Sequence, residues 1–232
     1  MKHYRFRPFD EILNLVLPRF CCCCGEMLVG DEREICIRCA GHLPYSEDAG
    51  VPGNGTEELF QGRIPLVAGA SLLRFQIGES SQQIVHEIKY HNNKSLAILM
   101  GRLLGQRLAA SGRFDEVELL VPVPLHRRKE RKRGYNQSAL LCEGIAQLFP
   151  REIMIDNIFR KIDTESQTHR NVSERYTAME KVFDVRNPEK LAGKHILVVD
   201  DVITTGSTIA NCCDALLQIP DVKISVASLA RV

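Results

Sequence analysis

The sequence has no apolar run that approaches the roughly 18 residues needed to cross a membrane as a helix. Its first stretch, MKHYRFRPFDEILNLVLPRF, has Asp10 and Glu11 where a secretory signal would have its apolar centre. That pattern predicts a short amphipathic lead-in helix instead of a signal. We therefore expect a cytoplasmic protein without membrane insertion, in a compartment where disulfides are rare.

The chain also lacks a strong net charge, which is +1 at pH 7. This balance argues against a globally basic nucleic-acid binder. No G-x-x-x-x-G-K-[ST] sequence occurs, which argues against a P-loop nucleotide triphosphatase. The 232 residues, 44% apolar and 25% charged, contain no internal repeat and have the composition of a globular protein.

Cysteine is concentrated at one end, where six of nine cysteines lie within residues 21–39. Two Cys-x-x-Cys pairs there predict a small ribbon that binds one structural zinc ion through four thiolates. The predicted ligands are Cys21, Cys24, Cys36 and Cys39. Cys22 and Cys23 make the register ambiguous, although Gly25 favours the pairing of Cys21 with Cys24. A chance run of cysteines or a redox pair is the alternative.

A polar, glycine-rich passage, Tyr45–Glu58, indicates a loop or linker. We place a domain boundary there. The expected parts are a lead-in helix and zinc ribbon at 1–47, a linker at 48–62 and a main domain at 63–232.

Strands alternate with helices beyond the linker. Strands are predicted at Ile64–Phe75, Val117–Leu125, Ile153–Phe159, Lys194–Asp200 and Val222–Val232. Helices are predicted at Ser80–Ser111, with a break near His91–Lys94, at Ser138–Phe149 and at Gly206–Ile219. Fully apolar strands that alternate with helices indicate an α/β fold, with a mostly parallel sheet flanked by helices on both faces.

The sequence ILVVDDVITTGST, Ile196–Thr208, joins an apolar strand to a hydroxyl-rich turn. In an open α/β sheet, ligands bind beyond the carboxyl ends of the strands. The turn precedes a helix whose free N–H groups suit a phosphate, and its glycine lets the backbone approach the anion. The predicted phosphate-binding residues are Thr204, Thr205, Gly206, Ser207 and Thr208.

Asp200 and Asp201 would repel that phosphate, so we assign them to sugar hydroxyls or a divalent cation. A ribose 5-phosphate satisfies both requirements, with its phosphate in the turn and its hydroxyls against the acids. The alternative is that the hydroxyls only cap a helix and that the acids are solvated.

The stretch HRRKERKR, His126–Arg133, has six basic residues against one acidic residue. It is expected as a loop that folds over a pyrophosphate or grips a nucleic-acid backbone. Tyr135 offers a face on which a base of single-stranded DNA would stack. A solvated helix start is the alternative. The basic-loop residues are Arg127, Arg128, Lys129, Arg131, Lys132 and Arg133.

VVDDVITTGST closely resembles the phosphoribosyl-pyrophosphate (PRPP) binding signature of type I phosphoribosyltransferases. Together with the cysteine-rich N-terminus, EIKYHNNKSLA, VPVPLHRRKERKRGYNQS and TESQTHRNVSERY, it makes the chain similar to the ComF family. These are competence-associated, phosphoribosyltransferase-like proteins. The resemblance runs from about Cys21 to the end and implies a type I phosphoribosyltransferase-like α/β domain with a small N-terminal zinc ribbon of four cysteine ligands.

The resemblance also implies roles for single residues. By position, EIKYHNNK (Glu87–Lys94) matches the loop that holds pyrophosphate, with Lys89 as its cation and Tyr90 beside it. For Lys89, a surface position on an amphipathic helix is the alternative. The implied PRPP-binding set is Asp200, Asp201, Thr204, Thr205, Gly206, Ser207, Thr208, Lys89 and Tyr90.

Two further segments match the family. Gly134, Asn136 and Gln137 fit an R-G-[FY]-N-Q element, which supports a site role for Arg133 and adds Asn136 and Gln137 to the basic-loop set. A second family segment is matched by Gln167, Thr168 and Arg175. Ala178 departs from an asparagine common in relatives.

Two functions follow from these expectations. In the first, the protein binds PRPP or a related ribose phosphate with Mg²⁺ and transfers the phosphoribosyl group with release of pyrophosphate, with Asp200 and Asp201 as catalytic residues. In the second, it binds a sugar phosphate or single-stranded DNA without turnover. The family name associates either function with DNA uptake and the competence machinery.

Overall fold

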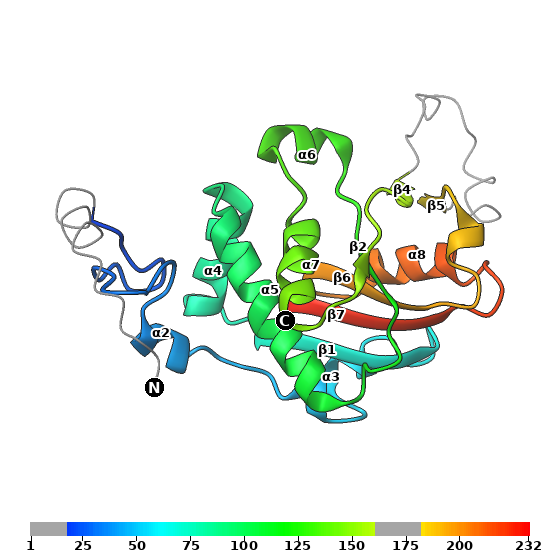
Figure 1. Cartoon of the computed structure of the whole chain (residues 1–232), viewed down its shortest axis with the longest axis horizontal. Helices are drawn as coiled ribbons and strands as arrows, with labels where there is room; N and C mark the ends of the chain where they lie inside the picture. The colour runs from blue at the N-terminus through cyan, green and yellow to red at the C-terminus, as the bar shows by residue number, and fades with distance from the viewer. Residues whose placement is uncertain (1–17, 161–181) are drawn as a thin grey trace, which may run out of the picture.

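The computed structural model describes residues 18–160 and 182–232 (Figure 1). The expected lead-in helix lies outside the described residues. So does the segment with Gln167, Thr168, Arg175 and Ala178. No helix within 18–160 and 182–232 has the length and apolar character required to cross a bilayer.

A five-stranded, fully parallel sheet in the order β1-β7-β6-β2-β3 forms the centre of the molecule (Figure 1). Its strands are β1 (Leu66–Arg74), β2 (Leu119–Pro122), β3 (Glu152–Ile153), β6 (His195–Ile203) and β7 (Lys223–Arg231). A separate antiparallel pair consists of β4 (Ile158–Arg160) and β5 (Phe183–Val185). The strand expected at Ile153–Phe159 is therefore wrong as one element. Asp156, in the left-handed region at φ 62°, turns the chain between β3 and β4.

Some helices precede β1 and the others lie between successive strands. They are α2 (Ile37–Gly41), η1 (Asp48–Gly50), α3 (Gly55–Glu58), α4 (Ser80–Tyr90), α5 (Lys94–Ser111), α6 (Arg127–Arg133), α7 (Gln137–Leu148), η3 (Pro188–Lys190) and α8 (Ser207–Leu216). The break predicted near His91–Lys94 is confirmed between α4 and α5. The expected basic loop is instead the helix α6, because the side chain of His126 caps its first turn and Gly134, at φ 78°, ends it.

Both faces of the sheet are covered, which explains the apolar runs in its central strands, such as Ile196–Val199 of β6. On β6, Leu197 and Val199 join the core that α4, α5 and α7 close. Ile196 and Val198 join the core that α8 closes on the other face. Since successive side chains of a strand point to opposite faces, a strand buried on both sides has no solvent-facing positions to make polar.

α5 and α7 pack with almost no space between their backbones. A Cβ atom on Gly144 would collide with the carbonyl oxygen of Ile98, and one on Gly101 would collide with that of Leu141. Only glycine allows this approach. The close contact holds α7 against α5, and α7 also contacts β6 and β2 of the sheet.

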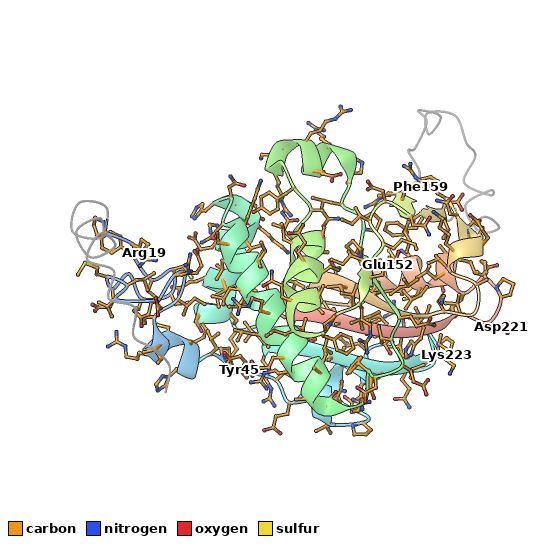
Figure 2. The ribbon with its side chains drawn as sticks, in the orientation of Figure 1. Arg19, Tyr45, Glu152, Phe159, Asp221 and Lys223 are labelled. Atoms are coloured by element: carbon orange, nitrogen blue, oxygen red, sulfur yellow. The ribbon has the colours of Figure 1, made fainter. Side chains whose placement is uncertain are left out.

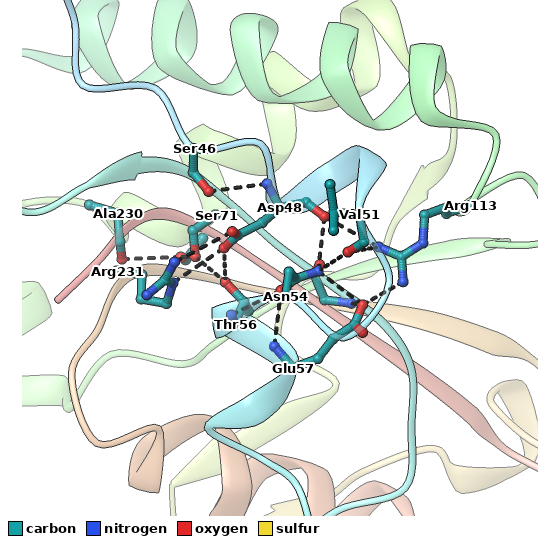
Figure 3. A network of polar contacts seen from close by, with 12 residues as sticks. Ser46, Asp48, Val51, Asn54, Thr56, Glu57, Ser71, Arg113, Ala230 and Arg231 are labelled. Carbon is teal, nitrogen blue, oxygen red and sulfur yellow. Dashed lines mark hydrogen bonds and ion pairs between the residues drawn. The ribbon is translucent and has the colours of Figure 1, made fainter.

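Residues 48–62, expected as a linker, include η1 and α3 and pack on the sheet (Figure 3). Asp48, 6% exposed, accepts from Thr56 Oγ1 at 2.5 Å and from Arg231 Nε at 3.2 Å. Burial alone would raise the pKa of Asp48, but these bonds, with one from Ser46, lower it below its usual value. A buried, hydrogen-bonded ion pair ties this segment to β7. The domain boundary drawn there stays a prediction.

The N-terminal ribbon (residues 18–47) lies at one end of the molecule and reaches the sheet through Tyr45, which forms a bridge with Leu73 of β1. Figure 2 shows Arg19 on the ribbon at one end, and Phe159 in β4 towards the other. The guanidinium carbon of Arg107, on α5, lies 4.2 Å from the centre of the Tyr45 ring, which fixes this junction against a main-domain helix.

Candidate functional site

Asp200 and Asp201 lie near the end of β6, within the strand and not beyond it. The Oδ1 atom of Asp200 accepts from the N–H of Asp201 at 2.8 Å and from the hydroxyl of Ser138, in the first turn of α7, at 3.1 Å. Ser138 was not among the expected site residues. It is 62 residues away in the sequence, and a serine near a helix start carries no signal beyond capping.

The Asp200 carboxyl is destabilised in its charged form. Burial, and then repulsion from Asp201, raise the pKa of Asp200 to about 7. The hydrogen bonds from Ser138 and from the Asp201 N–H oppose this rise, as does the ammonium of Lys89. Near neutral pH the group is therefore divided between a hydrogen-bond donor and an acceptor form.

Asp201 forms an ion pair with Lys89, whose Nζ atom lies 3.1 Å from its Oδ1 atom. The side chain of Asp201 is only 14% exposed and that of Lys89 only 21%. Lys89 is in the last turn of α4, so the pair joins two elements 112 positions apart in the sequence. Two residues that were predicted separately for one site are thus in contact.

The turn after β6 forms a small hollow that leads into α8. Thr204, Thr205, Ser207 and Thr208 are exposed around it. Gly206 is left-handed, at φ 72°, and an added Cβ would lie 2.9 Å from the Phe60 ring, so only glycine fits. The N–H groups in the first turn of α8 have no acceptor within the helix and carry partial positive charge. The site therefore offers hydroxyl and amide donors to an anion.

Arg63 lies beside this turn and was not expected there. Its Nη1 atom donates to the carbonyl oxygen of Thr205 at 2.7 Å. Arg63 follows the segment expected as a linker, so no local pattern connected it with a turn 142 residues later. The contact fixes the backbone of the turn from outside the sheet.

A second hollow lies next to the acids, between the end of α4 and α6. It is lined by Lys89, Tyr90, Asn92, Lys132, Arg133 and Tyr135. Tyr90 is 65% exposed, and the guanidinium carbon of Arg133 lies 5.6 Å from its ring centre. Arg128, Arg131 and Lys132 are exposed along α6. Lys89, Lys132 and Arg133 thus share one concave surface, the basic hollow, with the exposed ring of Tyr90.

Asn136 and Gln137, from the R-G-[FY]-N-Q element, form hydrogen bonds that hold the residues next to this surface in place. Asn136 caps α7 by accepting from the Ser138 N–H at 2.9 Å, and it donates to the carbonyl oxygen of Val123. Gln137 is buried and accepts from Arg133 Nη1 at 2.9 Å. Among the described residues, no hydrogen bond joins either side chain to Asp200 or Asp201.

Tyr135 is not the stacking face that its position suggested. It is only 9% exposed, and its hydroxyl donates to the carbonyl oxygen of Ile88. The ammonium of Lys94 lies 5.3 Å from its ring centre. Burial raises the pKa of Tyr135. The ring is part of the support between α4 and α7, and Tyr90 is the exposed aromatic side chain beside the basic residues.

Four sulfur atoms converge in the ribbon, those of Cys21, Cys24, Cys36 and Cys39, all within 4.8 Å of one another. The Sγ atoms of Cys24 and Cys36 are 3.8 Å apart. Thiolates around a tetrahedral zinc, with bonds of about 2.3 Å, would be separated by about 3.8 Å. The arrangement fits a metal such as zinc.

Backbone amides support these sulfurs. Cys21 Sγ accepts from the Cys36 N–H at 3.3 Å, and Cys36 Sγ accepts from the Cys39 N–H at 3.4 Å. Such bonds stabilise thiolates, the form that binds metal. The thiols of Cys22 and Cys23 lie outside the cluster and pack against the main core.

The ribbon contacts the turn that follows Lys89. Glu34 accepts a hydrogen bond from Asn93 Nδ2 at 2.9 Å. Asn93 also caps α5 by accepting from the Leu96 N–H at 2.9 Å. The metal cluster is therefore connected, through one polar contact and the packing of Cys22 and Cys23, to the helix pair that carries Lys89.

Comparison with known proteins bears on the main domain. Residues 136–231 match the model of the phosphoribosyl transferase domain. The match spans α7 to β7 and contains the two acids with the turn that follows them. With the parallel sheet and its flanking helices, it establishes a phosphoribosyltransferase-like fold, as the sequence predicted.

Among curated proteins, the chain is 32% identical over 151 residues to DNA utilization protein YhgH of Salmonella typhimurium, covering 64% of this chain and 66% of that protein. It is 26% identical over 152 residues to Competence protein F of Haemophilus influenzae, with the same coverage. It is 31% identical over 104 residues to Competence protein ComFC of Bacillus subtilis, covering 45% of this chain and 40% of that protein. The matched region thus spans just under two thirds of the first two relatives.

A solved hypoxanthine phosphoribosyltransferase from Staphylococcus aureus covers 60% of this chain and 74% of its own, at 12% identity and a TM-score of 0.35. A likeness this weak carries no argument about the site.

Proposed function

Because the chain belongs to the ComF family, with a phosphoribosyltransferase-like domain, we propose that it binds PRPP or a related ribose 5-phosphate at the carboxyl end of β6. The observation that carries the proposal is the juxtaposition of the two acids with the anion-binding turn of α8. The turn suits the 5-phosphate, and Asp200 with Asp201 suits the ribose hydroxyls.

The basic hollow beside the acids supports a place for the pyrophosphate. Lys89, Lys132 and Arg133 line it, so three positive charges face a group with about three negative charges. Magnesium fits by donor chemistry, since it prefers oxygen ligands and both the pyrophosphate and the carboxylates offer them. When bound, Mg²⁺ would neutralise charge on the leaving pyrophosphate.

We further propose that the site supports phosphoribosyl transfer. The bond between the anomeric carbon and the pyrophosphate oxygen breaks, and its electron pair leaves with the pyrophosphate. An acceptor nucleophile then forms the new bond to that carbon. The acids lie where they would stabilise positive charge that develops on the ribose ring, and the cations of the hollow would stabilise the departing anion.

Calorimetric titration with PRPP and MgCl₂ tests the proposal. Replacing both Asp200 and Asp201 with asparagine should weaken binding about 100-fold, because charge-assisted hydrogen bonds to two sugar hydroxyls are lost. Asp214→Asn, an exposed acid on α8, is the matched control and should bind like the unchanged protein. Unchanged affinity in the double variant would remove the ribose from this edge.

The basic surface favours a second candidate function, the binding of single-stranded DNA, which would agree with the names of the competence and DNA utilization relatives. Tyr90 offers an exposed ring for stacking, and α6 offers cations for the backbone. The competence machinery would be the corresponding partner.

For this second function we expect fluorescence anisotropy with a labelled oligo-dT to show salt-dependent binding. Neutralising Arg131, Lys132 and Arg133 to glutamine should reduce affinity at least about tenfold at low salt. It should also make the slope of log K against log salt concentration shallower by about two. The control variant neutralises Lys190, Lys194 and Lys223 to glutamine, away from α6. Equal losses in both variants would indicate a general charge effect instead of a site.

The four-cysteine cluster belongs to the same proposal. We propose that it holds one structural Zn²⁺, because four thiolates supported by N–H donors are the ligand set that this metal prefers.

A further inference from the structure

The Lys89–Asp201 pair raises a question that the proposed function leaves open. Asp201 is proposed to bind a ribose hydroxyl, yet in the free protein it already has a cation 3.1 Å away. The pair is largely withdrawn from water, so it is screened less than a surface pair. A sugar that takes Asp201 must therefore compete with Lys89.

The ammonium of Lys89 has a second anion within its range, the pyrophosphate proposed for the basic hollow. Its side chain lines the basic hollow with Lys132 and Arg133, on the side of the acids where the pyrophosphate is proposed to bind. An ammonium on a flexible four-carbon stem can serve either anion, but not both fully at once. The residues that line the hollow include two other cations and no carboxylate. The ammonium is therefore more stable beside Asp201 until an anion binds in the hollow.

The movement required is that of the side chain alone. α4 ends immediately after Lys89, where His91 is held by Glu87 through a 2.7 Å contact from its Nδ1 atom. Asn93 then caps α5 and bonds to Glu34 of the ribbon. The backbone that follows Lys89 is thus held in place by side-chain contacts.

Asp200 is the weaker partner for Lys89, since the ammonium acts on it only at longer range. Its Oδ1 atom is taken by the Ser138 hydroxyl and the Asp201 N–H, and no ion pair joins it to Lys89 among the described residues. Release from Asp201 therefore removes the one ion pair that Lys89 has among the described residues. A partly buried cation that loses its partner is destabilised.

We propose that Lys89 is a specificity-determining residue that selects ribose 5-phosphates carrying pyrophosphate on the anomeric carbon, by exchanging Asp201 for that group. The proposal rests on the proposed function. Ribose 5-phosphate displaces Lys89 from Asp201 but has no pyrophosphate with which the ammonium could pair. PRPP displaces it and supplies a new anion, so the exchange keeps the ammonium paired. The same contact disfavours the incomplete ligand and favours the complete one.

The test compares two ligands across three proteins by calorimetry in MgCl₂. The unchanged protein should bind PRPP at least about 100-fold more tightly than ribose 5-phosphate. In Lys89→Met the Kd for ribose 5-phosphate should fall about fivefold, because the competitor is gone. Its Kd for PRPP should rise about tenfold, because the pyrophosphate loses a charge-assisted contact. Lys190→Met removes an exposed charge on η3 that is neither paired with Asp201 nor part of the hollow, and should leave the ratio of the two affinities within about twofold.

The opposite signs separate the proposal from structural damage, which would weaken both ligands. Weaker binding of both ligands, or of PRPP alone, in Lys89→Met would overturn the proposed exchange. The proposed ribose phosphate site would not be contradicted by either result. If the unchanged protein bound neither ligand, the proposed function would fail, and with it this inference. Lys89→Gln replaces the methionine variant if thermal melting shows that the latter does not fold, and Lys89→Arg should retain the preference for PRPP.

Discussion

Replacing Cys36 with serine is expected to abolish zinc binding and to unfold the N-terminal ribbon while the sheet domain stays folded. In the ribbon the large aliphatic side chains of Leu28, Ile35 and Leu43 are buried, whereas Phe20, Met27 and Ile37 are exposed. So small a unit obtains its folding free energy from the metal, which for isolated zinc-binding peptides amounts to roughly 10–16 kcal/mol. Three thiolates cannot complete the tetrahedral site.

Mass spectrometry should find about one zinc per chain in the unchanged protein and almost none in Cys36→Ser. Limited proteolysis should then cleave within residues 18–47 only in the variant. Cys23→Ser is the matched control, because its sulfur lies outside the cluster, and it should retain the metal. Stoichiometric zinc in Cys36→Ser, or loss in Cys23→Ser, would show that other sulfurs bind it.

Loss of the ribbon should also reach the candidate site. Glu34 bonds to Asn93, and Cys22 and Cys23 pack against the core to which α4 contributes. Hydrogen exchange at the junction of α4 and α5 should therefore accelerate in Cys36→Ser, while β6 and β7 remain protected.

Replacing Asp200 with asparagine is expected to stabilise the protein at pH 8 and to do so much less at pH 4. In the unfolded chain Asp200 loses its proton near its ordinary pKa of about 3.9, whereas in the fold its pKa is about 7. Between these values the folded state holds a proton that the unfolded state has released, so stability falls as pH rises. Above pH 7 the full penalty is present.

A difference of about three pKa units corresponds to an upper limit of roughly 4 kcal/mol at pH 8. Asparagine keeps an oxygen that accepts from Ser138 and from the Asp201 N–H, but it carries no charge to desolvate. The gain in unfolding free energy should therefore appear between pH 4 and 8, as followed by urea denaturation. Asp214→Asn should show no such trend. An equal effect of Asp200→Asn at both pH values would mean that the carboxyl is not destabilised by the fold.

Together with the expected loss of PRPP binding, this result would identify a group that the fold retains at a cost in stability. Such groups are typical of functional sites.

The local chemistry of the site was readable from the sequence. The two acids, the hydroxyl-rich turn with Gly206 and the four cysteines are each defined by residues close together in the chain. Turns, caps and Cys-x-x-Cys spacings act over a few residues, so their physical consequences are visible in a short window. The alternation of apolar strands with helices likewise predicted the parallel sheet, because burial on both faces constrains most positions of β6 and β7.

Other features depend on contacts between residues far apart in the chain, which no local pattern encodes. The Asp201–Lys89 pair, the Ser138 contact with Asp200 and the Arg63 contact with Thr205 all join distant segments. Composition made the basic stretch look like a loop, whereas capping by His126 and Gly134 makes it a helix. Tyr135 looked exposed beside charged neighbours, but it is buried, with its hydroxyl bonded to Ile88 of α4 and Lys94 over its ring.

The sequence by itself thus determined which chemical groups the protein has and on which kinds of elements they lie, since propensity, capping and burial periodicity operate locally. Only the tertiary structure decided which of those groups meet. The close approach of α5 and α7 at their glycines, the order of the strands and the pairing of Lys89 with Asp201 all depend on long-range packing, which is specified by the whole core at once.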